Sequence, residues 1–205
     1  MISVDTLEFT GTAAYADKLV KHRLKTGLKD AVITGVVRIC WRDIKQGALG
    51  RITSDRIGLA GWQAGAEKHT PTNTIGLACS RDGAGTWDRL SHEFETTWQG
   101  TPGSFLAAEM VEAEPGRLLL FTTWINRSIP DRPLFNPETE GILPTRLLYC
   151  SSLDEGETWG EWSELSTPGL TGCAVTGPIL RWSDGTIACG FESFKEFDDP
   201  MPVEP

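Results

Sequence analysis

The sequence contains one turn motif twice, as Ser80-Arg-Asp-Gly-Ala-Gly-Thr-Trp87 and as Ser152-Leu-Asp-Glu-Gly-Glu-Thr-Trp159. The two copies share Ser, Asp, Thr and Trp at matched positions and lie 72 residues apart. A second turn repeats beside them, because Glu114-Pro-Gly-Arg117 recurs as Ser183-Asp-Gly-Thr186, with the glycines 69 residues apart. Two features with nearly the same period indicate a structural repeat of about 70 residues.

Short apolar segments lie around these turns and are rich in β-branched and aromatic residues. Gly, Pro, Asp and Ser separate them, and no long helical period interrupts them from residue 31 onward. The sequence therefore predicts an all-β fold, in which the best-marked strands are Ser104–Val111, Leu118–Ile125, Arg146–Cys150, Ala174–Trp182 and Thr186–Phe191.

The repeated turn has the composition of a structural element. An Asp carboxylate can accept hydrogen bonds from backbone N–H groups two or three residues further on, and Ser and Thr hydroxyls hold other backbone groups. Gly permits a positive φ, and the Trp ring packs beneath the turn as an anchor. We therefore expect a structural role for Ser80, Asp82, Thr86 and Trp87 in the first copy and for Ser152, Asp154, Gly156, Thr158 and Trp159 in the second.

The second copy matches the Asp-box pattern S-x-D-x-G-x-T-W at every specified position, whereas the first has Ala84 where the pattern has Gly. The chain thereby resembles the sialidase (neuraminidase) superfamily of BNR-repeat β-propellers, over about residues 31–198. In addition, residues 177–187 are similar to the first hairpin of a sialidase blade. The resemblance implies a six-bladed sialidase-like β-propeller with four strands in each blade.

The resemblance also implies how the chain is divided. Residues 1–30 are expected to form an N-terminal extension, and residues 31–205 part of the propeller. Blade 1 is predicted at about 31–99, blade 2 at about 103–168, and an incomplete blade 3 at 172–205. About two and a half of six blades would thus be present, and the remaining blades would be missing from this chain.

The composition argues against several classes of protein. The 19 Lys and Arg against 28 Asp and Glu give a net charge of −9, which disfavours a nucleic-acid or anionic-membrane partner. No apolar run has the length of a membrane-spanning helix, and residues 1–12 do not resemble a signal peptide. The five cysteines and three histidines lack metal-ligand spacing, and the cysteines are expected to be free thiols in a reducing compartment. The sequence therefore predicts no metal, no cofactor and a cytoplasmic location.

The resemblance places the active face opposite the Asp-boxes, on the loops that follow the second and fourth strands of each blade. In sialidases three arginines bind the substrate carboxylate, a Tyr activated by a Glu is the nucleophile, and an Asp is the acid/base. The first arginine lies in an Arg-Ile-Pro motif, for which Arg38-Ile-Cys40 is the nearest match, with Gly47 in the following turn. Arg51-Ile-Thr53 is the alternative, if Ser54-Asp-Arg56 forms that turn instead.

Other candidate site residues belong to the loops of the same face. Glu67 is the only carboxylate in the loop 62–74 and is the candidate acid, although the family has Asp in this role. Asp55 is an earlier option for the acid. We further expect catalysis by Glu192 and substrate binding by Arg127 and Lys195.

The two tyrosines, Tyr15 and Tyr149, are not placed to be the nucleophile, which the family has in a late blade. The leading hypothesis is a sialidase-type glycoside hydrolase that releases terminal sialic acid or a related sugar from glycoconjugates, inactive as this segment alone. One alternative is a non-catalytic Asp-box propeller that binds glycans or proteins. Another is a glycosidase whose acid pair lies elsewhere on the propeller. A carbohydrate is the expected substrate or ligand.

Overall fold

The computed structural model of the chain describes residues 47–51, 58–65, 69–81 and 86–201. All of them belong to one compact unit, Asp43–Pro205. Every element in these ranges is a β-strand, so the predicted all-β class is confirmed. None of the described residues belongs to a helix that could cross a membrane.

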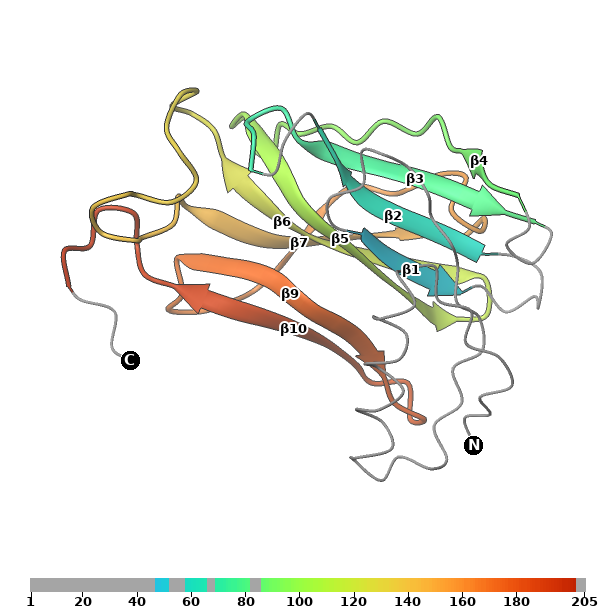
Figure 1. Cartoon of the computed structure of the whole chain (residues 1–205). Helices are drawn as coiled ribbons and strands as arrows, with labels where there is room; N and C mark the ends of the chain where they lie inside the picture. Colours follow the sequence, from blue (N-terminus) through green and yellow to red (C-terminus); the bar gives the residue numbers. More distant parts are fainter. Residues whose placement is uncertain (1–46, 52–57, 66–68, 82–85, 202–205) are drawn as a thin grey trace, which may run out of the picture. The chain divides into compact units, whose positions relative to one another are not determined.

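The strands form three antiparallel sheets, in each of which neighbours in sequence are neighbours in space. Figure 1 shows the sheets lying one after another, with the β9–β10 hairpin beside the β5–β8 sheet. This consecutive order is typical of propeller blades, in which each strand turns back on the one before it. The first sheet contains β1 (Gly47–Arg51), β2 (Gly58–Ala64), β3 (Thr74–Ser80) and β4 (Asp88–Arg89); the second contains β5 (Gly103–Glu114), β6 (Arg117–Asn126), β7 (Thr145–Ser152) and β8 (Ser163–Leu165); the third contains β9 (Gly172–Arg181) and β10 (Ile187–Phe194).

The strand bounds correct one detail of the predicted first blade. Gly47 lies in β1 and not in the turn after the first strand, because Gly47–Arg51 pairs with Gly58–Trp62. The connection between the first two strands therefore falls at residues 52–57. This agrees with the alternative reading, in which Arg51 belongs to the first strand of the sheet. Arg38 lies outside the described residues.

The main hydrophobic core fills the space between the first two sheets. Leu77 of β3 and Leu120 of β6 are at most 1% exposed and belong to this core, where β5 contacts the strands of the first sheet. Each such fully buried aliphatic side chain contributes about 1.5–3 kcal/mol. The core also contains Leu59, Ile75, Cys79, Phe94, Phe105, Ala108, Met110, Leu118, Trp124, Leu148 and Cys150.

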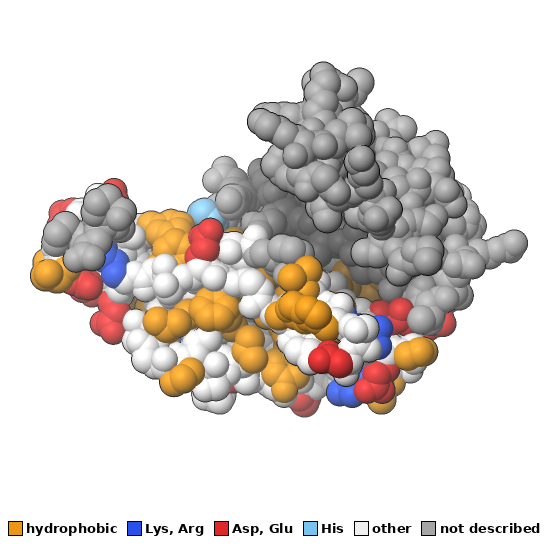
Figure 2. All heavy atoms as spheres, turned by 90° about the horizontal axis from the view of Figure 1, so that it is seen from below, with side chains coloured by type: hydrophobic (Ala, Val, Ile, Leu, Met, Phe, Trp, Pro, Cys, Tyr) orange, Lys and Arg blue, Asp and Glu red, His pale blue; other side chains and the backbone are white. Residues whose placement is uncertain are grey.

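The opposite face of the β5–β8 sheet packs against the β9–β10 hairpin. Phe121 of β6, stacked on Tyr149 of β7, meets Ile179 and Cys189 of the hairpin in one apolar cluster. The outer surface of the hairpin carries exposed hydrophobic side chains, and the view from below shows such groups gathered there among acidic residues (Figure 2). Among the described residues, the second sheet is thus covered on both faces, whereas the hairpin is covered on one.

Candidate functional site

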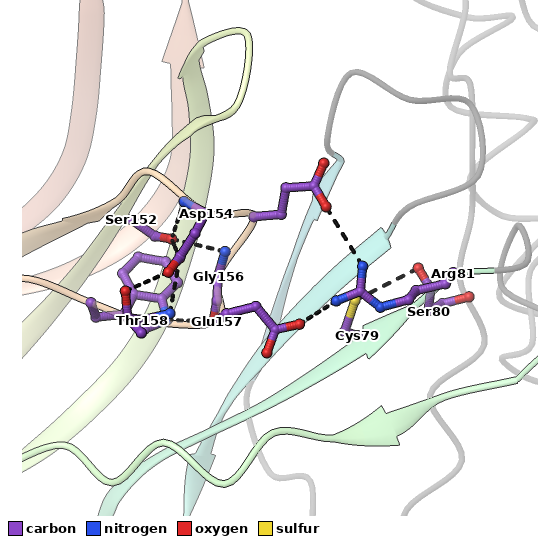
Figure 3. A network of polar contacts seen from close by, with 10 residues as sticks. Cys79, Ser80, Arg81, Ser152, Asp154, Gly156, Glu157 and Thr158 are labelled. Carbon is purple, nitrogen blue, oxygen red and sulfur yellow. Dashed lines mark hydrogen bonds and ion pairs between the residues drawn. The ribbon is translucent and has the colours of Figure 1, made fainter.

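The second Asp-box turn is closed by its own side chains, as Figure 3 shows. The Asp154 carboxylate accepts hydrogen bonds from the backbone N–H of Thr158, at 2.9 Å, and from the Thr158 hydroxyl. The Ser152 hydroxyl accepts the N–H of Gly156 at 2.8 Å and donates to Asp154. Since these donors favour the charged carboxylate, with the Thr158 hydroxyl first, they lower the pKa of Asp154. The turn therefore uses its polar residues for structure, although Asp154 reaches four residues ahead and not the expected two or three.

The same turn packs against the first sheet and is linked to the first copy. A Cβ on Gly156 would lie 2.7 Å from Cδ2 of Leu59 in β2. Arg81, the second residue of the first copy, forms ion pairs with Glu155, at 3.6 Å, and with Glu157 (Figure 3). All three partners are exposed, so each pair contributes at most about 1 kcal/mol. The Asp-box turns thus connect neighbouring sheets. A ligand site is therefore expected on the loops at the other end of the strands.

The first copy of the turn is described only in part. Ser80 is buried and Thr86 is exposed, whereas Asp82 lies outside the described residues. The indole nitrogen of Trp87 is buried and has no hydrogen-bond partner in the described part of the chain. In the second copy the corresponding Trp159 donates to the carbonyl of Gly156 at 3.0 Å.

Arg127 organises the loops at the other end of the sheets. It follows β6, is 4% exposed, and donates through Nε to Ser104 Oγ of β5 at 2.9 Å. Its Nη2 donates to the His69 carbonyl in the β2–β3 loop at 3.0 Å, and its Nη1 to the Arg132 carbonyl at 3.4 Å. One guanidinium thus joins two sheets and two loops, because its planar fork presents five N–H donors in fixed directions.

The electrostatic setting of Arg127 is unusual for a buried cation. Its partners are all neutral oxygens, and it forms no ion pair with a described residue. Burial removes water from the guanidinium and lowers its pKa from the ordinary value, although the group stays charged at any physiological pH. The arrangement keeps a positive charge beneath the loop face.

A second cluster fixes the long β6–β7 loop to the segment after β10. Nη2 of Arg132 donates to both carboxylate oxygens of Asp198, at 2.7 and 2.9 Å, and the guanidinium lies 3.9 Å from the centre of the Phe197 ring. Asn136 and Thr139 both donate to the Phe197 carbonyl. The Phe197 side chain is 8% exposed, so this contact closes a small hydrophobic core of its own.

Two of the residues predicted for catalysis and substrate binding lie in and just after β10. Glu192 lies within β10, paired with Ala174, and is exposed without a partner among the described residues. Lys195, just after β10, donates to the Met201 carbonyl. Asp198, in the same segment, pairs with Arg132.

The remaining candidate residues, Glu67, Arg38 and Asp55, lie outside the described residues. In the described ranges, no group of three or more His, Cys, Asp or Glu side chains could hold a metal ion. Sequence reasoning missed Ser104, Arg132 and Asp198, since only the fold brings together the loops that carry them.

Trp124, at the end of β6, serves packing and not sugar stacking. It is 4% exposed, and its indole N–H donates to the Thr96 carbonyl at 2.9 Å. Its ring lies 5.5 Å from that of Trp98, and a Cβ on Gly103 would collide with it. Trp124 therefore belongs to the hydrophobic core.

Replacing Arg127 by Ala tests its part in the loop face. We expect the free energy of unfolding to fall by roughly 2–4 kcal/mol, because one buried and two partly buried acceptors lose a charged donor. Arg127→Lys should recover only part of this loss, since one ammonium cannot reach all three oxygens. Chemical denaturation measures the change. Arg117→Ala, which removes an exposed arginine paired with Glu114 at 3.7 Å, is the matched control and should change stability by less than about 0.5 kcal/mol. Equal losses in both variants would contradict the assignment.

Comparisons with known proteins agree with this architecture. A scan against protein-family models and a search of curated proteins found no match. Among solved structures, the chain is similar to the Trypanosoma rangeli sialidase in complex with 2,3-difluorosialic acid, at 12% identity and a TM-score of 0.52. The similarity covers 82% of this chain and 28% of that one. The chain is also similar to the Penicillium chrysogenum α-L-arabinanase complexed with arabinobiose, at 14% identity and a TM-score of 0.48, over 72% of this chain and 40% of that one.

The chain thus spans about 28% of the length of the sialidase that it matches. Identity of this order speaks for the fold alone. The described residues therefore have the fold of a sialidase-like β-propeller, of which they form two four-stranded blades and two strands of a third.

Proposed function

We propose that this chain forms part of a sialidase-type glycoside hydrolase that releases terminal sialic acid or a related sugar from glycoconjugates. The observation that carries the proposal is the likeness to a sialidase propeller over 82% of the chain. The arrangement of the loops supports it, because the β2–β3 loop, the β6–β7 loop and the segment after β10 are bonded together on the face opposite the Asp-box turn. Loops held by a rigid scaffold are where binding residues collect.

In this proposal the described residues mainly build the site. Arg127 fixes the His69 end of the loop that carries Glu67, and Lys195 and Glu192 stand beside the segment that Arg132 holds. Glu67 is the proposed acid and Arg38 or Arg51 the proposed carboxylate-binding arginine. The nucleophile and the other two arginines would come from blades beyond the three that this chain contributes to. The proposed location is the cytoplasm.

A non-catalytic Asp-box propeller is the second candidate function, and one observation favours it. Arg127 and Lys195, both expected to bind substrate, direct donors at protein oxygens. A binding module needs no pair of carboxylates placed for acid and base chemistry. It would hold a glycan through the loop face without turning it over.

Binding and turnover measurements distinguish the candidates. We expect the 205-residue chain to bind sialyllactose more tightly than lactose in a calorimetric titration, and to leave a fluorogenic sialoside intact. A polypeptide that carries this chain within a whole propeller should hydrolyse the sialoside and not a fluorogenic arabinofuranoside. Binding of sialyllactose with no turnover by the whole propeller would favour the non-catalytic module. Turnover of the arabinofuranoside alone would favour a different glycosidase, and binding of neither sugar would overturn the proposal.

A further inference from the structure

Glu109 is a partly buried carboxylic acid beside the apolar contact between the β5–β8 sheet and the β9–β10 hairpin. It lies in β5 opposite Phe121 of β6, and its face of the sheet is the one that packs on the hairpin. No hydrogen bond or ion pair joins it to another described residue. An ionised carboxylate without such partners is costly in an apolar contact.

A bulge in β5 directs Glu109 to this face. Between Leu106 and Glu109 the strand advances three residues while β6 advances two, from Thr123 to Phe121. Ala107, inside the bulge, has a φ of 69°, which is a strained conformation for a residue with a Cβ. Because side chains alternate along a strand, the extra residue turns Glu109 away from the first sheet and toward the hairpin.

No described group around Glu109 neutralises its charge. Among the described residues, the titratable groups on this face are the Tyr149 phenol of β7, the Cys173 thiol of β9 and the Cys189 thiol of β10. Arg181 of β9 is exposed near the hairpin turn, and Glu192 of β10 is exposed beyond a register shift in the hairpin. Arg146 of β7 and Glu164 of β8 pair with each other at 3.3 Å. They lie on the opposite face, because Arg146 alternates with Leu147 and Tyr149.

We propose that Glu109 is a proton-controlled latch for the β9–β10 hairpin: the hairpin docks on the β5–β8 sheet while the carboxyl is neutral and loosens when it ionises. The loosening follows from the cost of an unpaired carboxylate in the contact, which water entering between the sheets relieves. The hairpin leads directly into the Lys195–Met201 segment of the loop face, so the latch acts on the same face as the proposed ligand site. The latch itself does not depend on the proposed function.

The pKa of the Glu109 carboxyl agrees with this geometry. Burial raises the pKa of Glu109 from the ordinary value of 4.5 to about 7. A raised carboxyl pKa in the docked state means that docking favours the protonated form. The contribution of Glu109 to hairpin docking is therefore fully present at low pH. It is lost as the pH rises from the ordinary carboxyl pKa of 4.5 through about 7. The window lies within the physiological range.

Hydrogen exchange measures the latch in the whole 205-residue chain. We compare the exchange rates of peptides from Ile187–Phe194 in the natural protein and in Glu109→Gln at the same pH, so that intrinsic exchange cancels. The ratio of natural to variant rates should rise on the order of 20-fold between about pH 5.5 and pH 8, as a docked pKa of about 7 and an open value of 4.5 require. A ratio that does not change with pH overturns the proposal. Glu114→Gln, an exposed carboxylate of the same strand, is the control and should behave as the natural protein does.

Labelling of Cys189 provides a second readout. Burial raises the pKa of the Cys189 thiol, and an ionised Glu109 raises it further. If the hairpin stays docked at about pH 8, the natural protein therefore has less reactive thiolate than Glu109→Gln and should be labelled more slowly. Opening of the hairpin makes labelling faster. Faster labelling supports the latch, and slower labelling overturns it. Should Glu109→Gln not fold, peptides of β7 in the natural protein serve as the internal reference. A ratio of hairpin to β7 exchange rates that rises with pH supports the latch, and a ratio that does not change overturns it.

Discussion

Gly156→Ala is expected to lower the free energy of unfolding by roughly 2–4 kcal/mol, as measured by chemical denaturation. Two costs add. Gly156 has a φ of 89°, a conformation that costs a residue with a Cβ about 1–2 kcal/mol. The new Cβ would also stand 2.7 Å from the Leu59 side chain, and overpacking of this kind costs about 1–3 kcal/mol. Because Leu59 is fully buried between the sheets, it has little room to move.

Gly185→Ala separates the two costs. Gly185, in the β9–β10 turn, has nearly the same φ, 88°, but nothing lies within 4 Å of the Cβ that it would gain. We expect this control to lose only about 1 kcal/mol, the conformational part alone. If Gly156→Ala were no more destabilised than Gly185→Ala, the Asp-box would not be packed against Leu59 as described.

Gly141→Ala is the second large effect that we expect, and it falls on the loop face. A Cβ on Gly141 would lie 2.0 Å from the Glu196 carbonyl oxygen and 2.8 Å from Cα of Phe197. These are backbone atoms, so no side-chain rotation can relieve the clash. The β6–β7 loop and the segment after β10 must separate, which breaks the hydrogen bond from Ile142 N–H to the Lys195 carbonyl at 3.1 Å. We expect a cost of about 3 kcal/mol.

In Gly141→Ala, the loss of stability should appear first in the segment after β10 and only then in the whole fold. Limited proteolysis should cut the variant within residues 194–201 at least tenfold faster than the natural protein, because about 1.4 kcal/mol already corresponds to tenfold in the open population. Gly160→Ala is the control, since the nearest atom to its added Cβ is the Ser151 carbonyl oxygen at 3.6 Å. Equal cleavage of the two variants would show that the loops are not in contact.

Much of the fold could be predicted because its signals are local. The Asp-box residues sit within eight positions of one another, and the strands around them alternate or run apolar for long enough to be recognised. All five best-marked strands occur in the structure, with Ala174–Trp182 appearing as Gly172–Arg181. The first strand of the first sheet was misplaced, because Gly47 looks like a turn residue. Its role in β1 is set by pairing with Trp62, and pairing is not a local property.

The site was less predictable for a related physical reason. Arg127 was identified from its loop, but its partners Ser104 and His69 lie 23 and 58 residues away in the sequence. No spacing rule connects such positions. Likewise, Arg132 and Asp198 form their ion pair across 66 residues of sequence. Charge composition predicts how many ions a loop contains and not which of them meet.

The ion pairs of Arg81 with Glu155 and Glu157 influence which copy of the repeat packs beside which. Two like copies packed in this way would form neither ion pair, because two first copies would set an arginine against glycines and two second copies would set a leucine against glutamates. Here Arg81 corresponds to Leu153 in the second copy, while the two glutamates correspond to glycines in the first. The copies agree where the turn must close and differ where they touch. Complementary charge at the variable positions therefore favours the first copy beside the second and disfavours two like copies side by side.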